Sequence, residues 1–89
     1  MRATFRKTFV KDLERYAKDK DLLAKVKEII LQVEAADSVD AIANLKKLKA
    51  EGAYFRIRSG HFRLGLIIEN DTVTFVRLLH RKEVYRYFP

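Results

Sequence analysis

Arginine side chains in the second half of the chain are spaced in a way that suits a phosphate-binding site. Arg56, Arg58 and Arg63 fall in stretches of alternating sequence, and no Asp or Glu occurs in residues 52–68. Arginine binds phosphate oxygens through paired hydrogen bonds and stays charged at any working pH. These residues predict a surface for a polyanion. Nucleic acid is the leading candidate, and the neighbouring Tyr and His rings suit stacking on unpaired bases, the usual mode of single-stranded RNA recognition.

Other polar and aromatic side chains extend this candidate surface. We expect one face of a sheet to gather Tyr54, Arg56, Arg58, His61, Arg63 and His80, with Arg81 and Tyr85 just beyond it. A second group of cations fits a solvated face better than a site, with contact to an RNA backbone as the alternative: Lys46, Lys47 and Lys49. Two imidazoles without a third ligand do not predict a metal site, and we expect no cofactor.

Apolar spacing predicts the elements that position these residues. Alternation in residues 2–6 indicates a short strand. Two stripes with helical spacing, over residues 8–17 and 22–33, predict an antiparallel helical hairpin, with Asp21 as the N-cap of the second helix. Ser38 is placed to cap a further turn that holds Val39, Ile42 and Leu45.

After Gly52 the apolar period becomes two, which predicts strands at 54–58, 61–69 and 72–80. Ser59-Gly60 and Asn70-Asp71 then form two-residue hairpin loops. For the segment 83–88, a helical turn and an extended tail both remain open.

The loops fix an expected register. The first hairpin pairs Ile57 with Phe62 and Phe55 with Leu64 on the buried face, and on the other face Arg56 with Arg63 and Arg58 with His61. Arginines that face each other destabilise a ladder, so these guanidinium groups are expected either to splay into water or to meet a polyanion. The second hairpin pairs Ile68 with Val73, Leu66 with Phe75 and His61 with His80. Leu64 opposite Arg77 breaks the pattern, which indicates a bulge or an edge position there.

Length and composition predict one α+β domain over residues 1–89, in which an N-terminal strand and a helical hairpin pack on an antiparallel sheet of about four strands. The net charge is +7, and residues 46–89 hold ten Lys/Arg against four Asp/Glu, which favours a nucleic-acid partner. The absence of cysteine excludes disulfides and thiolate chemistry. No apolar run is long enough to span a membrane, and the N-terminal residues do not resemble a secretory signal. We therefore expect a cytoplasmic protein with no membrane partner.

Three segments resemble the RelE/ParE toxin family. The similarity lies in Leu45-Lys-Lys-Leu48 followed by Tyr54-Phe-Arg-Ile-Arg58-Ser-Gly-His-Phe-Arg63, in His80-Arg81-Lys-Glu-Val-Tyr85, and in Phe9-Val-Lys-Asp-Leu13. The resemblance covers nearly the whole chain. It implies a compact fold like that of microbial ribonucleases, and a gene that lies beside that of an antitoxin.

The resemblance also implies an activity, ribosome-dependent cleavage of messenger RNA by attack of the RNA 2′-hydroxyl on its own phosphate. Arg56, Arg58 and Arg63 match the residues that hold the scissile phosphate, Arg81 matches a further arginine, and Tyr85 matches a stacking or proton-handling tyrosine. Some family members carry lysines where this chain has Arg56 and Arg58. Arginine does not give up its proton, so the base must come from elsewhere: His61 or His80 first, then Tyr85, with Glu83 also a candidate.

Two alternatives share the fold. A ParE-like protein would inhibit DNA gyrase, and a catalytically silent relative would bind only its antitoxin. The joint presence of Arg63, Arg81 and Tyr85 favours the nuclease. The expected partners are the ribosome with its message and a small antitoxin, acidic or partly disordered, that covers the face of Arg56 and Arg63. DNA is expected only through the antitoxin complex.

Overall fold

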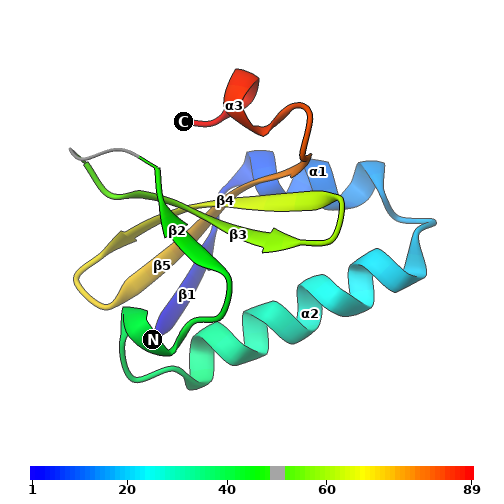
Figure 1. Cartoon of the computed structure of the whole chain (residues 1–89). Helices are drawn as coiled ribbons and strands as arrows, with labels where there is room; N and C mark the ends of the chain where they lie inside the picture. Colours follow the sequence, from blue (N-terminus) through cyan, green and yellow to red (C-terminus); the bar gives the residue numbers. More distant parts are fainter. Residues whose placement is uncertain (49–51) are drawn as a thin grey trace.

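A mixed five-stranded sheet with helices on both faces forms the molecule (Figure 1). The computed structural model describes residues 1–48 and 52–89. The order of strands across the sheet is β1-β5-β4-β3-β2, in which β1 runs parallel to β5 and the other neighbours are antiparallel. The elements are β1 (Arg2–Phe5), α1 (Lys7–Arg15), α2 (Lys20–Ala35), the 3₁₀ turn η1 (Val39–Ala41), β2 (Leu45–Lys47), β3 (Tyr54–Ser59), β4 (Phe62–Glu69), β5 (Thr72–His80) and α3 (Val84–Tyr87).

The main hydrophobic core lies between the sheet and the helices α1 and α2. Phe9 of α1 is fully buried and its ring lies 5.4 Å from that of Phe75 on β5. Val26 and Val33 of α2 enter the same core, which also contains Leu66 of β4. The short helix α3 lies on the opposite face of the sheet (Figure 1). The expected α+β architecture with a helical hairpin is therefore confirmed.

The expectation of about four antiparallel strands was incomplete. β2 is a fifth strand of only three residues, and the N-terminal strand joins the sheet in parallel. Three residues are too few for a period of two to stand out, which is why the pattern assigns Leu45 to a helical turn. In the structure η1 ends at Ala41, the Ser38 side chain makes no capping hydrogen bond, and Asn44 takes a positive φ of 61° directly before β2.

The expected register of the second hairpin is correct from its turn to Leu66 and wrong beyond it, where His80 faces Phe62 rather than His61. The expected register of the first hairpin is wrong. Ile68 pairs with Val73 and Leu66 with Phe75, across a turn in which Asn70 and Asp71 both take positive φ. Beyond Leu66 the register shifts at the predicted bulge, so Leu64 faces Leu78 and Gly65 faces Arg77.

The first turn is Gly60-His61 rather than Ser59-Gly60. Gly60 has a φ of 57°, which suits the first loop position of a turn that prefers glycine there. Ile57 therefore faces Leu64, and Arg58 rather than Arg56 faces Arg63. A shift of two residues leaves the side chains of β3 and β4 on their expected faces.

The N-cap of α2 is Asp19 rather than Asp21. The Asp19 carboxylate accepts a hydrogen bond of 3.1 Å from the Leu22 backbone N–H, whereas Asp21 lies within the first turn. Asp19→Ala should lower the free energy of unfolding by about 1 kcal/mol, because that N–H loses its partner. Asp21→Ala should cost about 0.3 kcal/mol through the helix dipole alone. Urea denaturation of both variants tests the assignment, and the reverse order would contradict it.

Candidate nucleic-acid interface

The face of the sheet that α1 and α2 leave uncovered, which we call the outer face, has an apolar part and a basic part. The apolar part is a second small core in which Leu79, Val84 and Phe88 are buried, with Tyr54 and Val76 packed against them. The helix α3 supplies Val84 and leads into Phe88, so the C-terminal segment covers this part of the sheet.

Among the described residues, no helix is long and apolar enough to cross a membrane.

The basic part is a group that we call the arginine cluster: Arg56, Arg58, Arg63 and Arg81. Arg58 and Arg63 face each other across β3 and β4, and Arg56 lies on the same face two residues along. Partial burial lowers the pKa of Arg63, the positive charges of Arg56, Arg58 and Arg81 lower it further, and nearby Tyr85 acts in the opposite direction. All four neighbours are thus close enough to Arg63 for their charges to act on it.

Two members of the cluster are held by main-chain carbonyl groups. Nη1 of Arg63 donates to the carbonyl oxygens of Gly60 and Phe62, both at 2.9 Å. Nη1 of Arg56 donates to the carbonyl oxygen of Asn44 at 3.0 Å, while its buried Nε has no partner among residues 1–48 and 52–89. Anchored guanidinium groups close to one another repel, and a phosphate would both relieve that repulsion and accept hydrogen bonds from their remaining N–H groups.

The other residues predicted to contact RNA do not all lie beside the arginine cluster. Lys46 pairs with Arg56 and so lies on the outer face beside the arginine cluster. Lys47 pairs with Phe55 and so lies on the other face. Tyr54 packs edge-on against Phe88 at 5.8 Å between ring centroids, which makes it part of the second core more than a free stacking surface. Lys49 lies outside the described residues.

His61 and His80 do not line the outer face, contrary to expectation. His80 pairs with Phe62, so its side chain points to the face that the helices cover. His61 lies in the turn and stacks on His80, with ring centroids 6.2 Å apart. The bulge is the cause, because the one extra residue in β5 moves every later side chain to the opposite face.

His80 also has a structural role. Its Nδ1 accepts a hydrogen bond of 3.2 Å from the Lys82 backbone N–H, which requires that nitrogen to be unprotonated. The Arg81 N–H donates to the carbonyl oxygen of His61 at 2.8 Å. These bonds fix the chain where it leaves β5 and thereby place Arg81 beside Arg63. Glu83, a further candidate base, raises the pKa of Arg77 and is not among the groups that act on Arg63.

Inspection of the sequence missed a buried ion pair at the edge of β5. Oδ2 of Asp12 accepts from Nε of Arg77 at 2.8 Å and from the Leu78 backbone N–H at 2.9 Å. One turn earlier in α1, the Thr8 hydroxyl donates to the Val76 carbonyl oxygen at 2.6 Å. β1 ends opposite Phe75, so these two side chains take the place of a strand partner for the rest of β5. The signal was present, since Asp12 lies three residues after Phe9, on the buried face of the helix.

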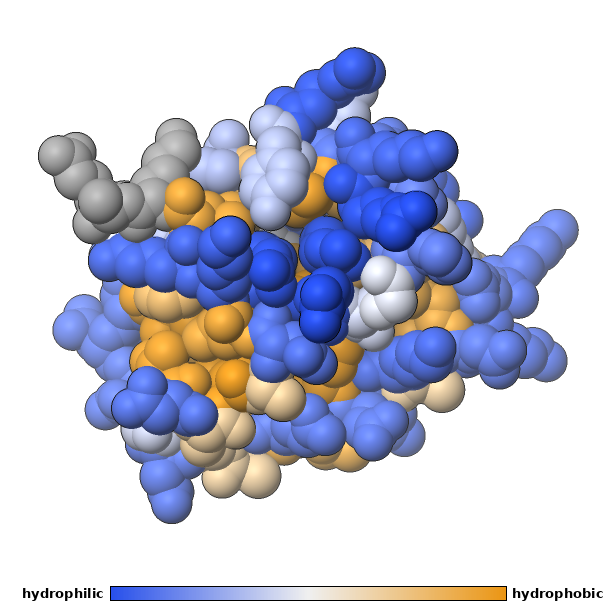
Figure 2. Space-filling model, in the orientation of Figure 1, coloured by the Kyte–Doolittle hydropathy of each residue, from blue (hydrophilic) through white to orange (hydrophobic). Residues whose placement is uncertain are grey.

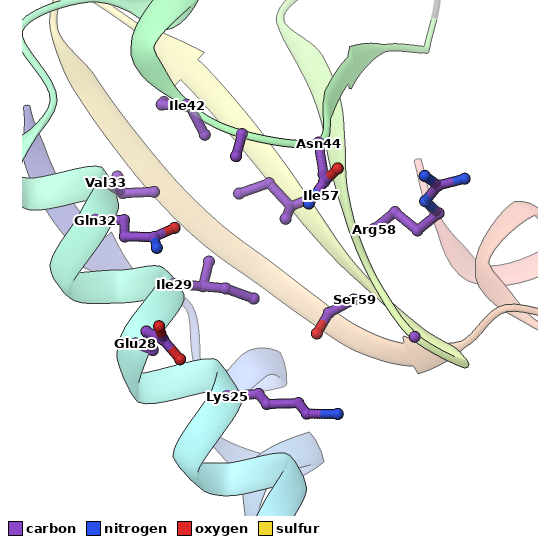
Figure 3. Close-up of a pocket in the computed structure, with 12 residues that line it drawn as sticks. Lys25, Glu28, Ile29, Gln32, Val33, Ile42, Asn44, Ile57, Arg58 and Ser59 are labelled. Carbon is purple, nitrogen blue, oxygen red and sulfur yellow. The ribbon is translucent and has the colours of Figure 1, made fainter.

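A groove of about 420 Å³ lies between α2 and the β2–β3 edge of the sheet. Ile29 and Val33 of α2 face Ile42 and Ile57 across it, and Lys25 and Gln32 stand at its rim (Figure 3). Figure 2 shows an exposed apolar patch, ringed by hydrophilic residues, on the side of the molecule where β2 lies. Apolar surface framed by polar residues is typical of protein-binding sites.

Comparison with known proteins agrees with this architecture. The model of the ParE toxin family of type II toxin–antitoxin systems matches residues 3–85. Toxin RelE3 of Methanocaldococcus jannaschii is 40% identical over 90 residues, which cover 100% of both chains. The toxin in a RelB-RelE antitoxin-toxin complex from Methanococcus jannaschii has a TM-score of 0.72 at 38% identity, over 97% of this chain and 99% of that one. YafQ of Escherichia coli shares the fold, with a TM-score of 0.74 at 16% identity, over 96% and 99% of the two chains.

The chain therefore belongs to the RelE/ParE family of toxins of type II toxin–antitoxin systems. The resemblance that its motifs indicated is confirmed, as is the fold that the resemblance implied.

Proposed function

We propose that this toxin cleaves messenger RNA on the ribosome. The observation that carries the proposal is that Arg56, Arg58 and Arg63 share the outer face of the sheet, with Arg81 and Tyr85 close enough for their charges to act on Arg63. In the proposed reaction the 2′-hydroxyl of a nucleotide attacks its own 3′-phosphate and the 5′-oxygen of the next nucleotide leaves. The products carry a 2′,3′-cyclic phosphate and a 5′-hydroxyl.

The arginine cluster meets the main electrostatic demand of this reaction. Negative charge builds up on the phosphoryl oxygens as the fifth bond forms, and fixed cations aimed at that charge stabilise the transition state more than the ground state. Arg63 is the best placed, because two carbonyl groups hold its guanidinium group in position before substrate arrives. Arg58 faces it across the ladder, and Arg56 and Arg81 flank it.

Tyr85 is the strongest candidate for proton transfer. It is 68% exposed and acts electrostatically on Arg63, so its hydroxyl is accessible beside the cluster. The phenolate form would accept the proton of the 2′-hydroxyl, and the neutral hydroxyl would donate to the leaving 5′-oxygen. The placement of His61 and His80 on the other side of the sheet moves Tyr85 ahead of them as the candidate.

Protein synthesis and gyrase supercoiling are the two targets to compare, because the fold is also that of ParE toxins. Purified protein should stop synthesis in a translating extract and leave supercoiling by purified gyrase unchanged. Inhibition of supercoiling at equal concentrations, with translation normal, would favour the gyrase inhibitor. If neither protein synthesis nor DNA supercoiling is inhibited, the catalytically silent relative is favoured.

We further propose a cognate antitoxin as the partner that restrains this site. Relatives have been solved with theirs, among them RelBE2 of Mycobacterium tuberculosis and YoeB-YefM of Staphylococcus aureus. An acidic segment would neutralise the arginine cluster, and apolar anchors would suit the groove beside α2. Contact with DNA is then expected only through the antitoxin.

Charge reversal should weaken this complex. The double variant Arg56→Glu/Arg63→Glu should raise the Kd for the antitoxin encoded beside the toxin at least tenfold, about 1.4 kcal/mol. The matched variant Lys18→Glu/Lys27→Glu changes the same number of charges at exposed positions on the helical side and should change the Kd less than twofold. Titration calorimetry at two salt concentrations measures both, and equal effects of the two variants would contradict the electrostatic part of the proposal.

A further inference from the structure

The C-terminal helix α3 is too short to be stable without contacts to the rest of the protein. It has four residues, far fewer than an isolated helix needs to form in water. Its place on the sheet must therefore come from side chains that it buries. Val84 is fully buried and Phe88, directly after the helix, is only 3% exposed. Tyr85 lies between them in sequence and is exposed, so its location depends on how these two neighbours are seated.

Phe88 is seated in a slot that exists because residue 65 is glycine. A Cβ on Gly65 would lie within 2.7–2.9 Å of three carbons of the Phe88 ring, closer than side chains can approach. Gly65 is not among the residues with positive φ, so what its missing side chain provides is space. The Tyr54 ring closes the slot by its edge-on contact with Phe88.

The slot lies next to the arginine cluster. Gly65 pairs with Arg56 across β3 and β4, and it lies two residues from Arg63 on the same face of the same strand. On the far side of α3, the Tyr87 ring lies 5.8 Å from the guanidinium carbon of Arg77, which Asp12 holds. The segment is thus fixed at both sides, while Tyr85 stays exposed and close enough to Arg63 for its charge to act on it.

We propose that Phe88 and the Gly65 slot are positioning elements that set Tyr85 at working distance from the phosphate held by Arg63. This inference rests on the proposed function, in which Tyr85 moves a proton. Phe88 touches no reacting atom and acts only through Tyr85. Displacement of a catalytic group by about 1 Å can cost on the order of 100-fold in rate.

Cleavage kinetics test the inference. Phe88→Ala, and independently Gly65→Ala, should lower kcat about 30- to 100-fold with KM unchanged, and Phe88→Leu should retain most activity. Val26→Ala is the matched control, because it shortens a buried side chain of the main core without touching α3 and should leave kcat unchanged. All rates are normalised to the folded fraction measured by circular dichroism.

The decisive comparison is a double-mutant cycle. If Phe88 acts through Tyr85, then Phe88→Ala should have no further effect on kcat in a Tyr85→Phe background. If the two substitutions act independently, so that the double variant loses the product of the two single effects, the inference is overturned. A Phe88→Ala effect no larger than that of Val26→Ala would overturn it as well.

A second readout needs no activity. With 3-fluorotyrosine at position 85, Arg63→Gln should shift the fluorine resonance in the otherwise unchanged protein and should not shift it in Phe88→Ala. An equal shift in both backgrounds would overturn the positioning role. If the unchanged protein shifts as expected yet cleaves no message, the proposed function has failed while the positioning has not.

Discussion

Arg63→Gln should lower kcat for message cleavage about 100- to 1,000-fold, the usual cost of removing one pre-positioned charge donor from a transition state. Arg63 is the member of the arginine cluster that two carbonyl groups anchor and that the other three surround. Single-turnover cleavage of a ribosome-bound message measures the effect. Arg2→Gln removes the same charge from an exposed position on β1 and should leave kcat unchanged.

The same substitution should not destabilise the protein. Burial and neighbouring cations lower the pKa of Arg63 in the folded state below its ordinary value. The protonated group therefore opposes folding at every pH below that shifted pKa, and the penalty disappears only as the pH rises through the interval up to the ordinary value. Enzymes are assayed far below this interval, so a neutral glutamine should leave the free energy of unfolding equal or higher. Urea denaturation that shows a clear loss of stability would contradict this account of the site.

Asp12→Ala should have the largest effect on stability, a loss of about 3–5 kcal/mol in the free energy of unfolding. The Asp12 carboxylate is 1% exposed and accepts from both Arg77 and the Leu78 backbone N–H. Its removal leaves a partly buried guanidinium group and a strand-edge N–H without partners. Arg77 also contacts Tyr87, so α3 should loosen as well.

Arg15→Ala is the matched control for Asp12→Ala. Arg15 lies 3.5 Å from the same carboxylate but is half exposed, and such pairs contribute less than about 1 kcal/mol. The two variants should therefore differ clearly in stability, as measured by thermal and urea denaturation. Equal losses would mean that the buried network is not what secures β5 to α1.

The second hairpin is predictable because its turn residues determine its geometry. Asn70 and Asp71 both tolerate positive φ, both take it, and the apolar alternation on either side then fixes the pairing. The expected first turn begins one position too early, because two small residues precede His61 and the pattern alone does not show which loop position Gly60 takes. That error leaves the faces of β3 and β4 correct, so the alternation of the sequence alone suffices to group Arg56, Arg58 and Arg63 on one face.

The alternation of the sequence does not predict the positions of the two histidines. One extra residue at the bulge, which the sequence indicates as an alternative but does not locate, sends His80 to the helix-covered face. The position of Tyr85 does not follow from spacing at all. It depends on contacts of Phe88 with Gly65 and of Tyr87 with Arg77, which join residues far apart in the chain. The family motif points to Tyr85, and tertiary packing explains why it lies beside Arg63.

Primer extension on a message in a translating extract tests the central claim most directly. With purified toxin we expect cuts at defined positions within codons, ends that carry a 2′,3′-cyclic phosphate, and neither on naked RNA nor with Arg63→Gln. An intact message with normal protein synthesis would contradict the account and would leave the gyrase inhibitor or the silent antitoxin-binding relative in its place.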